Sequence, residues 1–99
     1  MNRLAVFSLR QAPEQLVLVL SDPQIALAGT VVAAPLKDAA TFPVAEGLNP
    51  RIAIGDSAMV LATEQLAAIP VKSLGRQLQD CIEHEYAIAN AINRLFFGI

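Results

Sequence analysis

The chain has 99 residues, of which 55% are hydrophobic, and it carries seven Lys and Arg against nine Asp and Glu. A chain of this length is expected to form a single domain that spans residues 1–99. The hydrophobic fraction exceeds the usual ~45–50%, which predicts that some apolar surface is covered in a homodimer. The net charge of −2 and the scattered cations argue against direct nucleic-acid binding, which needs clustered Lys and Arg.

The single cysteine, Cys81, rules out an intrachain disulfide, which fits a reducing compartment. The apolar segment between Arg3 and Arg10 is too short for a secretion signal. No stretch approaches the ~20 apolar residues of a membrane helix. We therefore expect a cytoplasmic protein without membrane contact.

Short apolar segments between turn residues predict strands over the first two thirds of the chain. The segment 16–20 is apolar at every position, as in a central strand covered on both faces. Pro35 is expected to end the strand that begins at Thr30, and a loop is expected from Lys37 to about Asn49. The predicted strands are 4–9, 16–20, 30–34, 51–54, 58–61 and 66–71, with a hairpin turn at Gly55-Asp56-Ser57 and an edge or bulge at Pro70.

From about Asp80 the apolar residues recur at helical spacing and predict a C-terminal helix of about sixteen residues. Asp80 and Glu83 resemble a capping box, and Gly98 is a natural end because it adopts the left-handed conformation without strain. Glu85 falls within the apolar arc, so its carboxylate needs a partner or the edge of an interface. The predicted core face contains Cys81, Ile82, Ile88, Ala89, Ile92, Leu95 and Phe96.

An adjoining face of this helix carries a stripe of two aromatic and two amide side chains, at spacing i, i+4, i+7 and i+11. Two interpretations are open: an ordinary exposed face, or a recognition stripe in which the aromatics supply contact area and the amides directional hydrogen bonds. An aromatic residue in the last turn has little core within reach, which favours recognition. The stripe consists of Tyr86, Asn90, Asn93 and Phe97.

The sequence contains no arrangement that predicts catalysis, a metal or a cofactor. His84, the only histidine, lies three residues from Cys81, and two ligands are too few for a structural zinc site. Cys81 is expected in the core, which disfavours a nucleophilic pair. The glycines are isolated, so no phosphate-binding loop is predicted, and no pair of carboxylates stands out for acid–base catalysis. A binding protein is favoured over an enzyme.

Several short motifs occur in collinear order along the chain. They are Ser21-Asp22, Pro35-Leu36, Ile54-Gly55-Asp56, Ile69-Pro70-Val71, Ser73-Leu74-Gly75, His84-Glu85 and, most specifically, the ending Asn90-Ala91-Ile92-Asn93-Arg94-Leu95-Phe96-Phe97-Gly98-Ile99. In these motifs the chain resembles the CcdB family of toxins. The resemblance implies a mainly β, SH3-like barrel of the CcdB, MazF and Kid toxin type with a C-terminal α-helix, assembled as a homodimer.

The same resemblance implies a toxin of a type II toxin–antitoxin system. Such toxins bind the gyrase A subunit, trap the gyrase–cleaved-DNA complex and so block topoisomerase activity, and a small antitoxin of the CcdA type releases them. No cofactor is implied. The implied gyrase-binding residues are Phe97, Gly98, Ile99, Asn93, Glu85, Tyr86 and Asn90, and a possible antitoxin or gyrase loop contains Ser21, Asp22, Pro23 and Gln24.

The chain departs from the family pattern on the implied partner-facing side. Phe97 replaces the usual Trp, which keeps a stacking face but loses area and the indole N–H. Pro23 and Gln24 replace two Ile, and Tyr86 replaces an Asn. Two alternatives therefore stay open: a homologue that binds the antitoxin without poisoning gyrase, and a MazF-like ribonuclease, which the acidic composition disfavours.

Overall fold

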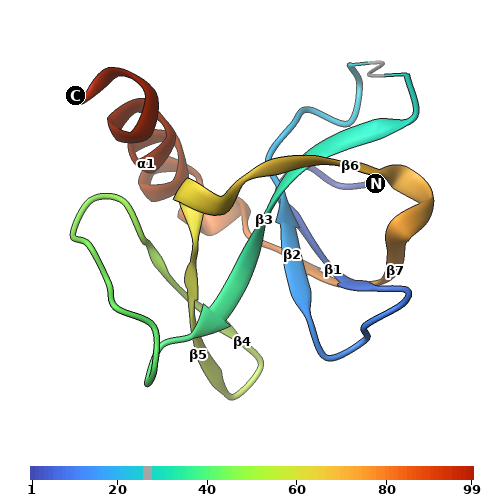
Figure 1. The fold of residues 1–99 in the computed structure, drawn as a ribbon, viewed down its shortest axis with the longest axis horizontal. Helices are drawn as coiled ribbons and strands as arrows, with labels where there is room; N and C mark the ends of the chain where they lie inside the picture. Colours follow the sequence, from blue (N-terminus) through green and yellow to red (C-terminus); the bar gives the residue numbers. More distant parts are fainter. Residues whose placement is uncertain (26–27) are drawn as a thin grey trace.

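The computed structural model describes residues 1–25 and 28–99, and these form a curled antiparallel sheet with one C-terminal α-helix (Figure 1). The strand order is β4-β5-β3-β2-β1-β7, and β6 pairs with β3. The curled sheet forms a half-barrel, and a side chain links its two end strands, because Gln79 Nε2 donates to the Ala53 carbonyl oxygen at 3.3 Å. The elements are β1 (Ala5–Leu9), β2 (Leu16–Val19), β3 (Thr30–Asp38), β4 (Arg51–Ile54), β5 (Ser57–Leu61), β6 (Ala67–Pro70), β7 (Leu74–Asp80) and α1 (Glu85–Phe97).

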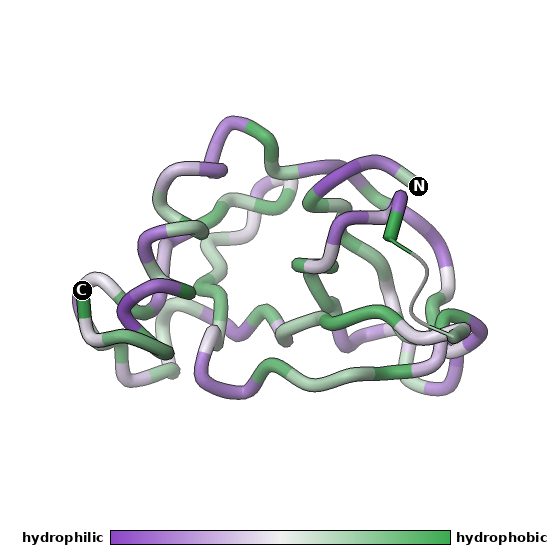
Figure 2. Tube along the Cα trace, turned by 90° about the horizontal axis from the view of Figure 1, so that it is seen from above, coloured by the Kyte–Doolittle hydropathy of each residue, from purple (hydrophilic) through white to green (hydrophobic). Residues whose placement is uncertain are grey.

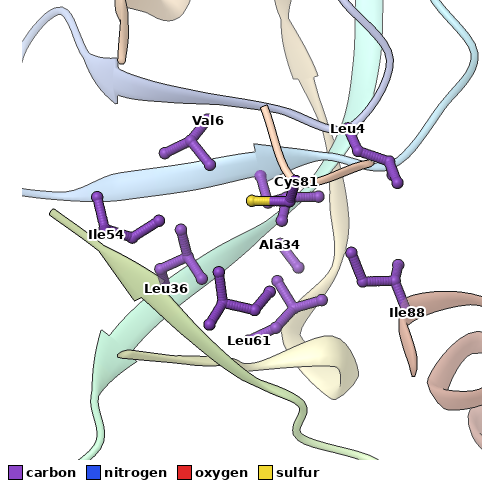
Figure 3. Packing of buried hydrophobic residues seen from close by; sticks show 10 residues of the cluster. Leu4, Val6, Ala34, Leu36, Ile54, Leu61, Cys81 and Ile88 are labelled. Atoms are coloured by element: carbon purple, nitrogen blue, oxygen red, sulfur yellow. The ribbon is translucent and has the colours of Figure 1, made fainter. Parts of the chain in front are cut away.

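The apolar segment around β2 is a central strand, as its composition predicted. It pairs with β1 on one side and β3 on the other. Its side chains alternate between two cores, with Leu18 in the larger cluster and Val17 and Val19 in the smaller one. Figure 3 shows the larger cluster, with Cys81 among the strand residues and Ile88 reaching in from α1.

The prediction that Pro35 ends its strand is wrong, because β3 continues to Asp38. On one side β3 pairs with β2. On the other it pairs first with β6, through residues 30–33, and then with β5, through residues 36–38. Pro35 lies at this changeover and accepts a hydrogen bond from Ala62 N at 2.9 Å. Its missing N–H therefore faces a gap in the ladder, where proline is tolerated.

The hairpin between β4 and β5 and the edge strand β6 are confirmed. Ile54 pairs with Ser57, so Gly55 and Asp56 form a two-residue loop. Gly55 has φ +59° and Asp56 does not have a positive φ, as in a type II′ turn. Pro70 ends β6, which pairs only with β3, so an edge strand carries it, as expected.

One strand, β7, and the start of the helix were not predicted correctly. β7 is exposed at four successive residues, so its sequence lacks the alternation that identifies a half-buried strand. Residues 82–84 form a 3₁₀ turn, and α1 begins only at Glu85. The predicted capping box is absent: Asp80 Oδ1 accepts only from Ile82 N, at 3.3 Å, and no N-cap side chain bonds to the 3₁₀ turn or to α1.

Candidate interaction surface on the C-terminal helix

The helix α1 packs on the sheet through a narrower face than its sequence predicted. Ile88 and Ala91 are buried, and Ile92 packs partly against the larger core. Of the predicted core residues, Cys81 is buried, but Ile82, Ala89 and Phe96 are exposed. The contact face is narrow because the helix covers only one end of the half-barrel (Figure 1).

The stripe predicted for recognition lies on the side of α1 opposite Ile88. At 100° per residue its members fall within about 60° of one another and about 180° from the buried face. Tyr86 is 87% exposed and Phe97 72% exposed, and Asn90 and Asn93 are also exposed. Two exposed aromatic rings on one helix face are unusual for a solvated surface.

The end of the chain extends this apolar surface. Gly98 has φ +73° and ψ +19°, and its N–H donates to the Arg94 carbonyl oxygen at 3.0 Å, which closes the helix as predicted. Ile99 is 83% exposed, and the Phe96 and Phe97 rings lie with their centroids 6.5 Å apart. In Figure 2 the tube is hydrophobic in colour at the C-terminal end, apart from a pale segment just before it. Phe96, which the sequence placed in the core, therefore adds to the outer surface.

Glu85, at the first turn of α1, has the ionic partner that its position required. Its carboxylate pairs with the Arg3 guanidinium, and both side chains are about half exposed. The hydrogen bond from Arg3 to Glu85 and the attraction of the two charges raise the pKa of Arg3, and Asp22 adds a smaller attraction. Arg3 therefore connects the start of α1 to the loop after β2. Arg3 could not be recognised as a site residue from the sequence, because 82 positions separate it from Glu85.

The predicted loop site, Ser21 to Gln24, lines a surface pocket together with Arg3. Asp22 Oδ1 accepts from Gln24 N at 2.9 Å, and Ser21 Oγ accepts from Val32 N at 3.0 Å. The Ser21 bond holds the loop against β3, and the Asp22 bond is local to the loop. The apolar side chains of Met1, Ile25 and Val71 are exposed and line the same pocket, so it presents both charged and apolar groups.

The predicted site residues therefore form two groups within one chain. Glu85 lies near the loop pocket, whereas Phe97, Gly98 and Ile99 lie at the far end of α1. A helix rises 1.5 Å per residue, so Glu85 and Phe97 are separated by about 18 Å along the axis. Figure 1 places the chain end and the loop after β2 on opposite sides of the molecule.

The loop before β4 supports α1 from the side. Asn49 is buried, with Oδ1 accepting from Ala45 N and Nδ2 donating to the Leu61 carbonyl oxygen and to Glu64. A Cβ added at Gly47 would lie 3.2 Å from Arg94 Cδ, so the helix and this loop are in close contact. A groove between them is lined in part by Asn90 of the stripe.

The chemistry around Cys81 and His84 does not point to catalysis. Cys81 is fully buried, and desolvation raises the pKa of its thiol, which disfavours the nucleophilic thiolate. Across residues 1–25 and 28–99 the structure holds no group of three side chains that could bind a metal ion. The one α-helix in this part of the chain is too short to cross a bilayer.

Comparisons with known proteins agree with this architecture. The family model described as CcdB protein matches residues 5–98. Among solved structures, the Mycobacterium tuberculosis toxin MazF-mt6 is 22% identical with a TM-score of 0.73, over 95% of this chain and 96% of that one. A second M. tuberculosis toxin is 21% identical (TM-score 0.73; 92% and 99% covered), and a mycobacterial endoribonuclease is 16% identical (TM-score 0.75; 96% and 89% covered). At these identities the structures establish a shared fold.

Proposed function

The chain belongs to the CcdB family of toxins from toxin–antitoxin systems, and from this premise we propose that it binds the gyrase A subunit and traps the gyrase–cleaved-DNA complex. The observation that carries the proposal is the exposed aromatic face of α1 together with the chain end that follows it. Tyr86, Phe97 and Ile99 are each more than 70% exposed, on a helix whose other side is packed. Exposed aromatic side chains on a rigid element are typical of residues that dominate binding energy.

In this proposal the protein acts by binding and not by catalysis. The Phe97 ring offers a face on which a cationic group of gyrase stacks. Asn93 and Asn90 supply directional hydrogen bonds beside it, and the left-handed Gly98 directs Ile99 away from the helix axis. Two copies related by a two-fold axis would present this surface twice to the dimeric gyrase A subunit.

The homodimer is part of the same proposal. Its support is the amount of apolar surface that a single copy leaves open, on a chain that is 55% hydrophobic. Patches of this kind mark protein interfaces. We place the toxin in the cytoplasm, where gyrase acts. A small antitoxin of the CcdA type is proposed to contact the loop pocket around Asp22 and Arg3. Among the residues that the structure describes, the large hydrophobic ones that are exposed are Met1, Ile25, Val71, Leu78, Ile82, Tyr86, Phe96, Phe97 and Ile99.

A gyrase cleavage assay tests the proposal. Purified protein is incubated with gyrase, supercoiled plasmid and ATP, and the products are denatured and resolved on a gel. Linear plasmid is expected with the natural chain, and much less is expected with Phe97→Ala. Leu78→Ala removes a side chain that is also exposed but lies on β7, and it should leave cleavage unchanged. Absence of linear product at about 10 µM protein, where even a weak complex would form, would contradict the proposal.

A second candidate function is antitoxin binding without gyrase poisoning. Phe97 has less area than Trp and no indole N–H, and Pro23 and Gln24 replace apolar residues in the loop. Under this alternative, overexpression leaves growth normal while antitoxin binding is retained. Ribonuclease activity, as in the MazF relatives, is not favoured by the family match. Incubation with RNA that contains single-stranded and structured regions tests it directly.

A further inference from the structure

Arg94, in the last turn of α1, borders the exposed stripe that carries Phe97. Residues three and four positions apart are neighbours on the surface of a helix, so Arg94 lies beside Phe97 and beside Asn90, one turn earlier. The Arg94 side chain is exposed, and it lies on the edge of the stripe that faces the loop before β4. It therefore adds a positive charge to a surface that otherwise offers aromatic rings and amides.

The loop before β4 restrains the arm of this side chain. A Cβ added at Gly47 would lie 3.2 Å from Arg94 Cδ, 3.5 Å from Nε and 3.9 Å from Cζ, so three successive atoms of the arm run across Gly47. Gly47 itself has φ +79°, a conformation that favours glycine. Because glycine has no side chain, it also leaves the space that the arm occupies, and the guanidinium is held next to the loop.

Hydrogen bonds within the loop make it a firm support. Leu48 N and Asn49 N both donate to the Ala45 carbonyl oxygen, at 3.0 and 3.1 Å, and Ala45 N donates to Asn49 Oδ1 at 2.9 Å. The buried Asn49 side chain also donates to the Leu61 carbonyl oxygen at 3.0 Å, which ties the loop to β5. A side chain that rests on such a support loses less conformational freedom when a partner contacts it.

The guanidinium of Arg94 has no partner within residues 1–25 and 28–99. The ion pairs of this part of the chain involve Arg3 and His84, and its arginine side chains donate hydrogen bonds only from Arg3 and Arg10. Glu46, which precedes Gly47, is not paired with Arg94. A guanidinium carries five N–H donors in a planar fork that matches the two oxygens of a carboxylate, and all five are available here.

We propose that Arg94 determines partner specificity by pairing with a carboxylate side chain on the gyrase A surface that α1 contacts. This inference rests on the proposed function and adds the chemistry of the opposing group. The groove between α1 and the loop has a volume of about 370 Å³ and is lined by Asn90, Glu46 and Arg51. The charges of Glu46 and Arg51 offset each other, so Arg94 sets the sign of this surface. A bidentate pair with Arg is among the stronger polar contacts, and the Asn90 amide can donate to the same carboxylate.

The test measures the Kd of the protein for purified gyrase A subunit, without DNA and at low salt. Arg94→Met keeps an unbranched arm and a good helix former but removes the charge, and it should raise Kd about tenfold, as expected for the loss of a charge-assisted hydrogen bond. Arg94→Lys keeps the charge without the fork and should raise Kd only about threefold. The matched control, Arg76→Met, removes an exposed cation from β7 and should change Kd less than about twofold.

Added salt should weaken binding of the natural chain more than binding of Arg94→Met, because only the natural chain has the ion pair. A cation that only stabilises the helix end predicts a lower unfolding midpoint for Arg94→Met with no change in Kd. The inference is wrong if Arg94→Met binds as tightly as Arg94→Lys, or if Arg76→Met loses as much binding as Arg94→Met.

The inference is also wrong if Arg94→Met weakens binding only when cleaved DNA is present, because the cation would then contact a phosphate. The proposed function and this inference fail in different ways. A natural chain that does not bind gyrase A at about 10 µM would overturn both. A natural chain that binds, together with an Arg94→Met variant of the same Kd, would overturn this inference alone.

Discussion

Replacing Ile88 by Ala should remove the main attachment of α1 to the sheet. Ile88 is 2% exposed and belongs to the larger core. The substitution deletes three carbon groups, about 2.4 kcal/mol of lost burial at ~0.8 kcal/mol each. The cavity left behind brings the total to about 3–4 kcal/mol. For a domain of this size the midpoint of thermal unfolding should fall by roughly 10–30 °C.

The same substitution at Ile82 is the matched control, since Ile82 is 40% exposed and precedes α1. It should cost less than about 1 kcal/mol. Thermal unfolding of both variants is followed by circular dichroism at one protein concentration, because dimer formation makes the midpoint depend on concentration. Equal losses for Ile88→Ala and Ile82→Ala would refute the packing described for α1, since the helical pattern in the sequence alone assigns both residues to the core.

Four further outcomes follow from the site and its supports. Phe97→Ala should raise the protein concentration for half-maximal plasmid cleavage roughly tenfold. Phe97→Trp should lower that concentration, because Trp restores area and an N–H. The same concentration for the natural chain and both variants would exclude the ring from the contact. Gly98→Ala should destabilise the helix end by about 1 kcal/mol through its positive φ alone, because nothing lies within 4 Å of the added Cβ; an unchanged unfolding midpoint would contradict this. Asn49→Ala should cost about 2–4 kcal/mol in chemical denaturation, because the buried Asn49 side chain makes three hydrogen bonds and the buried Leu61 carbonyl oxygen loses its partner. Burial raises the pKa of the Cys81 thiol, so the native state favours the protonated form. The stability of the native state should therefore fall as pH rises above the unfolded thiol pKa of about 8.5. Cys81→Ala should flatten that part of the pH–stability curve, and an unchanged slope would exclude Cys81 as the cause.

Periodicity in the sequence was sufficient for the segments that bury at least one face. The continuous apolar run of β2, the Gly55-Asp56 loop and the left-handed Gly98 are local signals, and each has the predicted structure. β7 was not predicted because an exposed strand has no alternation of apolar and polar residues. The prediction that Pro35 ends its strand was wrong because the residue lies where the partner of β3 changes from β6 to β5. That position depends on strands far away in sequence.

In the candidate site, too, local features could be predicted from the sequence and features that depend on distant contacts could not. The helical stripe of Tyr86 and Phe97 could be identified from spacing, because one helix sets the relative positions of its residues. The width of the buried face of α1 could not be predicted from spacing, since it depends on how much of the helix the half-barrel covers. Phe96 was therefore assigned to the core although it lies outside the buried face. The Arg3–Glu85 pair was also inaccessible, because only the closed fold brings the two residues together.

The pairing of β1 with β7 also governs how this protein is made. Ala5 of β1 pairs with Asp80 of β7, so one side of an early strand stays unsatisfied until most of the chain has left the ribosome. Contacts so distant in sequence slow folding, to the millisecond-to-second range typical of β-rich domains. Ile88 can dock α1 only on a core that already includes Cys81, the residue directly after β7. The aromatic surface of the helix is therefore correctly placed only after β7 has been made and has paired with β1.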